Sequence, residues 1–147
     1  MESDGRVLEQ LSWDECLRLM GSVPVGRIVY TRQALPAVEL VNFALDDGDI
    51  IIRTDGGGKL AAATRGAVVA FEADSVDAAG RAGWSVTVVG QSRAVTDGAE
   101  IAHMEQSGLM PWAPGNHDHF IRISPAIVNG RRIRAGQAKG AGDARRF

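Results

Sequence analysis

The sequence predicts a mainly β protein: a β-barrel with only short helices between its strands. About six or seven β-rich segments, bounded by Gly, Pro or Asp turns, follow one another along the 147 residues. The helical segments between them are too few and too short for a repeated parallel βαβ unit. The length fits one domain, expected over residues 1–134. Residues 135–147 contain Gly, Ala and charge without periodicity and are expected to form a disordered basic tail.

The first element expected is a helix over residues 13–21. Ser12 and Glu15 have the spacing of a capping box, in which the serine hydroxyl accepts a hydrogen bond from the glutamate amide. Gly21 is expected to end this helix. Cys16, the only cysteine, lies on its apolar face and is interpreted as a small core residue.

The later elements are mostly strands. They are expected over residues 26–30, 37–45, 50–54, 67–73, 84–95 and 120–133, the last interrupted by Pro125. Residues 46–49 have the composition of a hairpin turn. Two further helices are expected, over 59–65 and over 96–106, the second capped by Thr96 or Asp97.

Charge and composition exclude several classes of protein. The net charge is −2, and the first 130 residues hold 10 basic against 17 acidic side chains, so a nucleic-acid binder is not expected. One cysteine cannot form an intrachain disulfide. The N-terminus lacks the pattern of a secretory signal, and no apolar run is long enough to cross a bilayer. A cytoplasmic protein without a membrane partner is therefore expected.

The segment Ile52–Leu60 has the composition of an anion-binding site. A strand ends in Arg53 and Thr54, three glycines follow, and Lys59 opens a helix. Glycines let backbone N–H groups converge on a small anion, and the arginine, threonine and lysine add donors and charge. The spacing is not that of a Walker loop. An ordinary glycine turn flanked by solvated cations is the alternative.

Several short motifs follow one another in a familiar order. They are Gly26-Arg27-Ile28, Arg53-Thr54, Gly58-Lys59-Leu60, Phe71-Glu72-Ala73-Asp74, Gly83-Trp84-Ser85-Val86, Pro111-Trp112, Ile123-Ser124-Pro125 and Gly130-Arg131. This series, over residues 10–134, resembles the pyridoxamine 5′-phosphate oxidase-like, flavin-binding split-barrel family, in particular its small actinobacterial-type members. The resemblance implies an FMN-binding split barrel that forms a homodimer, with two flavin mononucleotides at the subunit interface.

The resemblance also implies roles for individual residues. Arg53 and Lys59, with Thr54 beside them, resemble phosphate ligands, and Asn42 resembles a polar contact to the isoalloxazine ring. Trp84 and Ser85 resemble a segment that approaches the cofactor from a later strand, and Trp112 lies in a segment resembling a loop that covers the ring. The cofactor-binding residues expected are Asn42, Arg53, Thr54, Gly58, Lys59, Trp84, Ser85 and Trp112.

Five side chains have alternative interpretations. Glu72 and Asp74 share one face of a strand, either as a solvated or arginine-paired face, which we favour, or as a polar patch near the cofactor. Trp84 is a stacking or an interface residue, or both. His117 and His119 suit a surface loop or a hydrogen bond to a ligand better than a metal site, which needs a third ligand.

The function implied by the resemblance is that of an FMN-dependent oxidoreductase acting on an unknown small molecule, with a nicotinamide nucleotide as reductant. No residue is an obvious acid or base, and the catalytic residues stay unassigned. Two alternatives remain open at this point: a deazaflavin-dependent reductase on the same fold, and a non-catalytic carrier or sensor that binds flavin or haem.

Overall fold

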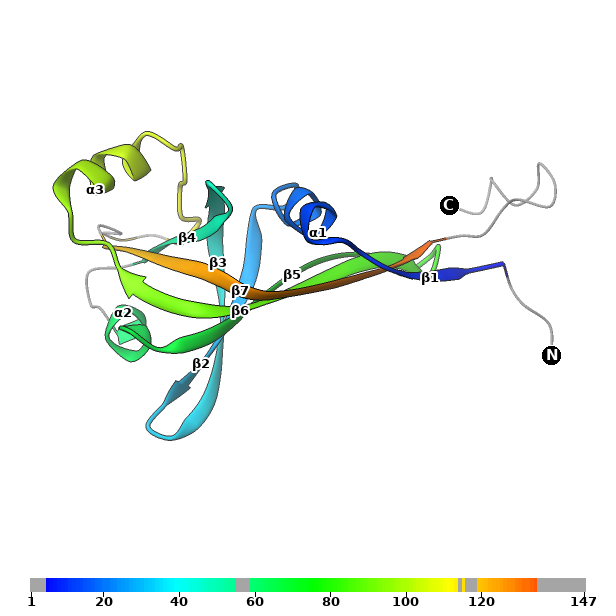
Figure 1. Cartoon of the computed structure of the whole chain (residues 1–147), viewed down its shortest axis with the longest axis horizontal. Helices are drawn as coiled ribbons and strands as arrows, with labels where there is room; N and C mark the ends of the chain where they lie inside the picture. Colours follow the sequence, from blue (N-terminus) through cyan, green and yellow to red (C-terminus); the bar gives the residue numbers. More distant parts are fainter. Residues whose placement is uncertain (1–4, 55–58, 114, 116–118, 135–147) are drawn as a thin grey trace.

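The structure, a computed structural model, describes residues 5–54, 59–113, 115 and 119–134. Within these residues the chain forms seven strands and three helices (Figure 1). In chain order they are β1 (Val7–Gln10), α1 (Trp13–Met20), β2 (Val25–Arg32), β3 (Leu35–Asp46), β4 (Asp49–Thr54), α2 (Lys59–Thr64), β5 (Val68–Asp77), β6 (Ala82–Ala94), α3 (Gly98–Glu105) and β7 (His119–Arg134).

The strands form one antiparallel sheet that closes on itself. Its order is β1-β7-β4-β3-β2-β5-β6, and the additional pairing of β6 with β7 joins the last strand to the start of the barrel. β1 pairs with the far end of β7, beyond the residues of β7 that pair with β4. The predicted mainly β barrel is therefore confirmed, and closure leaves few strand edges without a partner.

The core fills the barrel and follows the two-residue period of the strands. Ile28, Phe71 and Val88 are fully buried neighbours on three adjacent strands, and Phe43 contacts Phe71 edge to face at 4.8 Å. A second, smaller cluster lies outside the barrel, where Met104 of α3 and Leu109 cover Ile51 and Phe120. This second cluster attaches α3 and the loop after it to the barrel wall.

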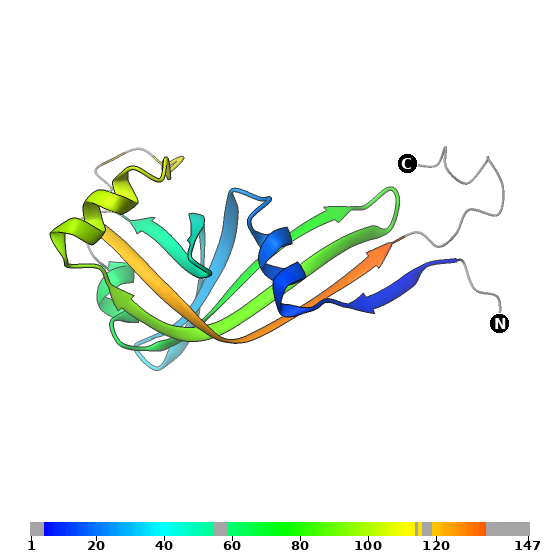
Figure 2. The same ribbon diagram turned by 45° about the horizontal axis from the view of Figure 1, so that its top comes forward.

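β5, β6 and β7 extend beyond the barrel. Figure 2 shows the β5–β6 hairpin, the end of β7 and β1 projecting together to one side, away from α2 and α3. We call this projection the arm and define it as residues 73–85 and 130–134 together with β1. Its strands are paired throughout, Trp84 with Arg132 for example, so the arm is a continuation of the sheet.

The local predictions for α1 are confirmed. Ser12 caps the helix by accepting a hydrogen bond from the Glu15 amide (3.2 Å), and Gly21 is the C-cap. Cys16 is fully buried, and burial raises the pKa of its thiol. Asp97, one of the two predicted cap residues, is the N-cap of α3.

The structure differs from the sequence prediction in the strands. β1 is not among the predicted strands, because its four residues, two apolar and two polar, are too few to show a period. β7 is not interrupted at Pro125. The register with β6 skips Ala126 instead, and this bulge lets the strand continue past the proline. The tail, 135–147, lies outside the described residues. Over the part of the chain that is described, no helix is long and apolar enough to cross a membrane.

We expect the bulge to depend on Gly90. A Cβ atom at Gly90 would collide with the backbone carbonyl of Ser124, whereas a Cβ at Gly98, at the start of α3, would meet nothing within 4 Å. Gly90→Ala should lower the free energy of unfolding by about 1–3 kcal/mol, the usual effect of overpacking. Gly98→Ala should be neutral or slightly stabilising. Urea unfolding midpoints check this, and equal midpoints for the two variants would contradict it.

Candidate functional site

Asn42 of β3 and Arg53 of β4 lie next to each other on the outer wall of the barrel. The register of β3 and β4 ends with Phe43 opposite Ile52, and Asn42 and Arg53 are the residues directly beyond this last pair. Both residues point away from the barrel interior, because their neighbours Phe43 and Ile52 are buried in the main core. Two of the predicted cofactor-binding residues, from separate motifs, thus lie at the same end of the β3–β4 ladder, and we call them the Asn42–Arg53 pair.

The loop after α3 lies over this pair. The backbone N–H of Trp112 donates to Oδ1 of Asn42 (2.8 Å), and a guanidinium nitrogen of Arg53 donates to the carbonyl oxygen of Leu109 (3.2 Å). The Asn42 amide nitrogen also donates to the Pro24 carbonyl (3.4 Å). The structure therefore brings together three predicted site residues, Asn42, Arg53 and Trp112. Their role toward a cofactor stays a prediction.

Arg53 is further held by an aromatic ring. Its guanidinium carbon lies 5.1 Å from the centre of the Phe120 ring, and Phe120 is its partner in the β4–β7 register. This distance is within the range of a cation–π interaction. Ring and loop together fix the guanidinium near the end of β4.

A charged cluster around Arg122 fastens α3 beside this site. The buried guanidinium of Arg122 pairs with Asp46 (2.6 Å), Asp49 (2.7 Å) and Glu100 (3.0 Å), and Glu100 also pairs with Arg93 (2.7 Å). Hydrogen bonds from Arg122 and Arg93 lower the pKa values of Asp46 and Glu100 respectively. The cluster joins α3 to β7 and to the β3–β4 turn, so the loop that leaves α3 starts from a fixed point.

Of the other three residues of the predicted phosphate site, Thr54 and Lys59 are among the described residues. Thr54 is buried and, one residue after Arg53, lies on the opposite face of β4, toward the main core. Lys59 is the first residue of α2. Gly58 lies outside the described residues.

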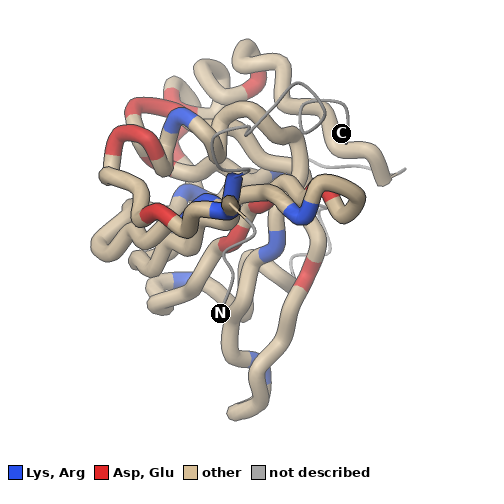
Figure 3. The backbone as a smooth tube through the Cα atoms, turned by 90° about the vertical axis from the view of Figure 1, so that its right-hand side faces the viewer, with Lys and Arg blue, Asp and Glu red and all other residues tan. Residues whose placement is uncertain are grey.

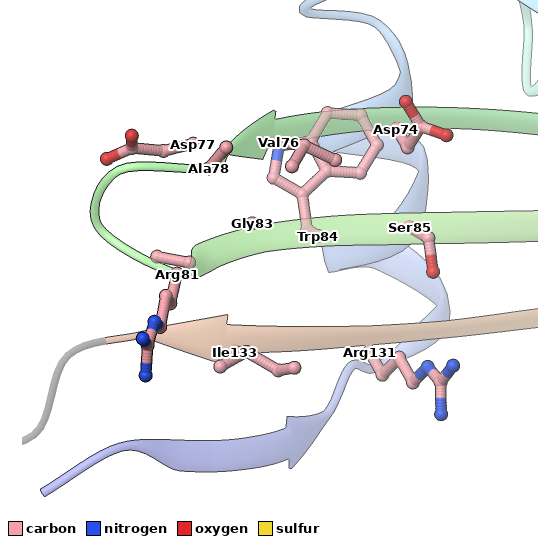
Figure 4. A pocket seen from close by; sticks show the side chains of 11 residues that line it. Asp74, Val76, Asp77, Ala78, Arg81, Gly83, Trp84, Ser85, Arg131 and Ile133 are labelled. Carbon is pink, nitrogen blue, oxygen red and sulfur yellow. The ribbon is translucent and has the colours of Figure 1, made fainter. Parts of the chain in front are cut away.

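Trp84 and Ser85 lie at the other end of the molecule, in the arm. Ser85 pairs with Asp74 and Arg131 on the outer face of the sheet, and Trp84, half-buried, packs against the main core. Figure 4 shows a hollow between them and the hairpin tip, a pocket of about 310 Å³. Its lining residues are Asp74, Val76, Asp77, Ala78, Arg81, Ala82, Gly83, Trp84, Ser85, Arg131 and Ile133.

The strand register separates the two halves of the predicted site within one chain. Arg53 pairs with Phe120 of β7, and Ser85 pairs with Arg131 of the same strand. Residues 120 and 131 are eleven positions apart, which corresponds to roughly 36 Å along a strand. The two halves of the predicted site therefore lie at opposite ends of β7 within one chain.

An apolar row crosses the outer face of five strands. Val38, Val29, Ala70, Val89 and Ile127 are successive partners in the register of β3, β2, β5, β6 and β7. They point outward, because the residues next to them, such as Ile28 and Phe71, are buried in the barrel. The two ends of the row, Val38 and Ile127, are exposed. An exposed apolar row of this length on a sheet face is typical of a protein interface.

Beside this row lies the pair of carboxylates noted in the sequence. Arg27 of β2 reaches both Glu72 (3.0 Å) and Asp74 (3.3 Å), which confirms the interpretation as an arginine-paired strand face. Burial is the largest effect on the Glu72 carboxyl, and the hydrogen bond and repulsion from Asp74 add to it. Together they raise the pKa of Glu72 from 4.5 to about 7, against the opposing effect of Arg27.

Viewed from the arm end, Figure 3 shows basic and acidic positions interspersed along the backbone.

The histidines show no metal site in the part of the chain that is described. No group of three or more His, Cys, Asp or Glu side chains there could hold a metal ion. His119 begins β7, and His103 contacts Asp46 through Nε2 (2.9 Å). His117 lies outside the described residues.

The closed antiparallel barrel with its projecting arm and its arginine at a strand end defines a split-barrel protein. Residues 12–132 match the family model described as pyridoxamine 5′-phosphate oxidase, and the chain belongs to this family. The family resemblance seen in the sequence is thereby confirmed.

Relatives of this chain are found in actinobacteria. Uncharacterized protein Rv0080 of Mycobacterium tuberculosis is 42% identical over 133 residues, which cover 87% of each chain. The FAD binding protein from Mycobacterium smegmatis is 35% identical, with a TM-score of 0.72, over 85% of this chain and 98% of that one. The conserved protein of unknown function DIP1874 from Corynebacterium diphtheriae is 31% identical, with a TM-score of 0.71, over 84% and 96%.

We expect Glu72 to make the stability of the fold depend on pH. The folded protein keeps this proton up to about pH 7, whereas the unfolded chain releases it near 4.5. The unfolded state therefore binds fewer protons in this window, and the free energy of unfolding should fall as the pH rises from about 4.5 to 7.

Urea unfolding of the wild type at pH 5 and pH 8, compared with Glu72→Gln, measures this contribution. The variant should lose this part of the fall in stability, whereas Glu105→Gln, a change at the exposed end of α3, should behave like the wild type. An unchanged pH dependence in Glu72→Gln would show that another group is responsible.

Proposed function

We propose that the chain binds a flavin nucleotide between two copies of itself and acts as a flavin-dependent oxidoreductase on a small molecule, with FMN as the expected cofactor. The observation that carries this proposal is the Asn42–Arg53 pair at the end of the β3–β4 ladder, which one loop joins through Trp112 and Leu109, in a chain of the pyridoxamine 5′-phosphate oxidase family. The similarity to the FAD binding protein of Mycobacterium smegmatis supports the choice of a flavin. FAD contains the ring and first phosphate of FMN, so the same groups suit both.

The residues fit the two ends of such a molecule. The Arg53 guanidinium supplies a fork of donors for a phosphate, fixed over Phe120, and Lys59 opens the next helix. Asn42 supplies an amide that can donate and accept at the edge of a flavin ring. Trp112, 69% exposed, has an indole available to cover the ring. A bound flavin supplies hydride or electron transfer, and a nicotinamide nucleotide is the expected reductant.

Two features support a homodimer. The predicted site is divided between the barrel end and the arm, and a second copy in the opposite orientation can bring its arm to the first copy's Arg53. The apolar row from Val38 to Ile127 offers an outer sheet face for that contact. The proposed complex has two sites, each with the Asn42–Arg53 pair from one copy and the Ser85 region from the other.

The cofactor is tested by titrating the purified protein with FMN, FAD and the deazaflavin coenzyme in parallel, followed by flavin fluorescence. We expect saturable binding of a flavin. Arg53→Ala should weaken it about 10- to 100-fold, because a charge-assisted hydrogen bond contributes roughly 1.5–3 kcal/mol. Arg65→Ala, which removes an exposed arginine just after α2, is the matched control and should bind like the wild type.

The three ligands give different answers. Preference for the deazaflavin would keep the site and change the cofactor. Equal affinity of Arg53→Ala and Arg65→Ala would show that Arg53 is not a phosphate ligand. If no ligand binds to the wild type, the proposed function is wrong. Once a flavin is bound, its reduction by NADH and NADPH separates an oxidoreductase from a carrier.

The shared site predicts complementation between two defective subunits. Arg53→Ala and Ser85→Glu should each bind flavin weakly on their own. When the two variants are unfolded and refolded together, half of the dimers contain one copy of each, and one of their two sites is intact. About one quarter of all sites should then regain wild-type affinity. A mixture with no high-affinity sites would show that Arg53 and Ser85 do not serve one site across the interface.

A further inference from the structure

Both polar groups of the Asn42–Arg53 pair already have partners in one short segment. Oδ1 of Asn42 accepts from the Trp112 amide, and Arg53 donates to the Leu109 carbonyl. We call residues 109–112 the strap. These bonds use the acceptor of Asn42 and a donor of Arg53, which are groups that a flavin nucleotide would need in the proposed site.

The strap is fixed at one end and exposed at the other. Leu109 is 7% exposed and packs with Met104 and Phe120 in the smaller cluster. Met110 and Trp112 are 70% and 69% exposed, so their side chains bury little apolar area in this position. The outer part of the strap can therefore leave the barrel wall at a small hydrophobic cost, and the buried Leu109 side chain is the anchor that holds the strap closed.

When the cofactor replaces the strap, Asn42 and Arg53 keep the same number of hydrogen bonds. A cofactor that accepts from Arg53 and donates to Asn42 replaces the two bonds that the strap gives up, and the freed Trp112 amide and Leu109 carbonyl become accessible to water. Before the cofactor arrives, the same bonds keep two polar side chains satisfied and in position on the barrel wall.

We propose that the strap competes with the cofactor for Asn42 and Arg53, so that cofactor binding and release of the strap are coupled. This inference depends on the proposed function, because it concerns the same site. Since only molecules with the strap released are ready to bind, the apparent affinity for the cofactor is reduced by the fraction of time that the strap is closed. Release also frees Trp112 to cover the bound ring.

The test uses the full chain and FMN, with FAD in parallel. Leu109→Ala removes the anchor of the strap without changing Asn42 or Arg53, and it should bind flavin about 3- to 10-fold more tightly than the wild type. Met110→Ala, a truncation at the neighbouring exposed position, is the matched control and should leave the affinity unchanged. Circular dichroism verifies that both variants are folded.

Amide hydrogen exchange of the wild type gives a second, independent measurement. The Trp112 amide is hydrogen-bonded to Asn42 in the free chain, so its exchange should become faster when flavin saturates the protein. Bound ligands usually slow exchange near their site, which makes this direction specific for strap release. The measurement stands even if Leu109→Ala does not fold.

The outcomes separate this inference from the proposed function. Tighter binding by Leu109→Ala and faster exchange at Trp112 support the strap. Flavin binding with slower exchange at Trp112, or with equal or weaker affinity in Leu109→Ala, overturns the strap and leaves the cofactor assignment intact. Absence of flavin binding in the wild type and in both variants overturns the proposed function and the strap with it.

Discussion

The antiparallel ladder between β6 and β7 holds this molecule together over its whole length. Twelve register pairs, from Gly83 with Ile133 to Ala94 with Ile121, close the barrel and then continue into the arm. At one end the ladder leads to α3 and to the pairing of Phe120 with Arg53. At the other it carries Ser85 and the pocket. The separation of the two halves of the candidate site is thus a direct consequence of strand length and of the bulge that lets β7 pass Pro125.

Arginines make the polar connections on the outside of the barrel. Arg122 joins three carboxylates from β3, β4 and α3, and Arg27 joins two from β5. A planar guanidinium with several donors can bridge elements that a lysine would contact at a single point. Arg53 donates to the backbone carbonyl of Leu109 and lies over the ring of Phe120, so it connects β4 to the loop after α3 and to β7.

In the proposed function the flavin supplies the redox chemistry, and the protein's part is to bind and orient it. The Asn42–Arg53 pair lies at the end of the β3–β4 ladder, whereas the segment over it is held by two hydrogen bonds and one buried leucine. For the proposed site, two positioned side chains under a cover that can be released would be preorganised and still admit a large ligand.

The sequence by itself determined the local features and the class of fold. The serine cap of α1, the burial of Cys16, the hairpin between β3 and β4 and the alternation of Glu72 with apolar residues all depend on neighbours a few positions away, and these were predicted correctly. Only the tertiary structure decided which distant residues meet. The pairing of Arg27 with Glu72, the central role of Arg122 and the 11-residue offset between Arg53 and Ser85 all follow from strand order and register. Those are set by packing of the whole barrel, because shifting one strand by a residue would turn its apolar side chains outward. No short stretch of sequence contains that information.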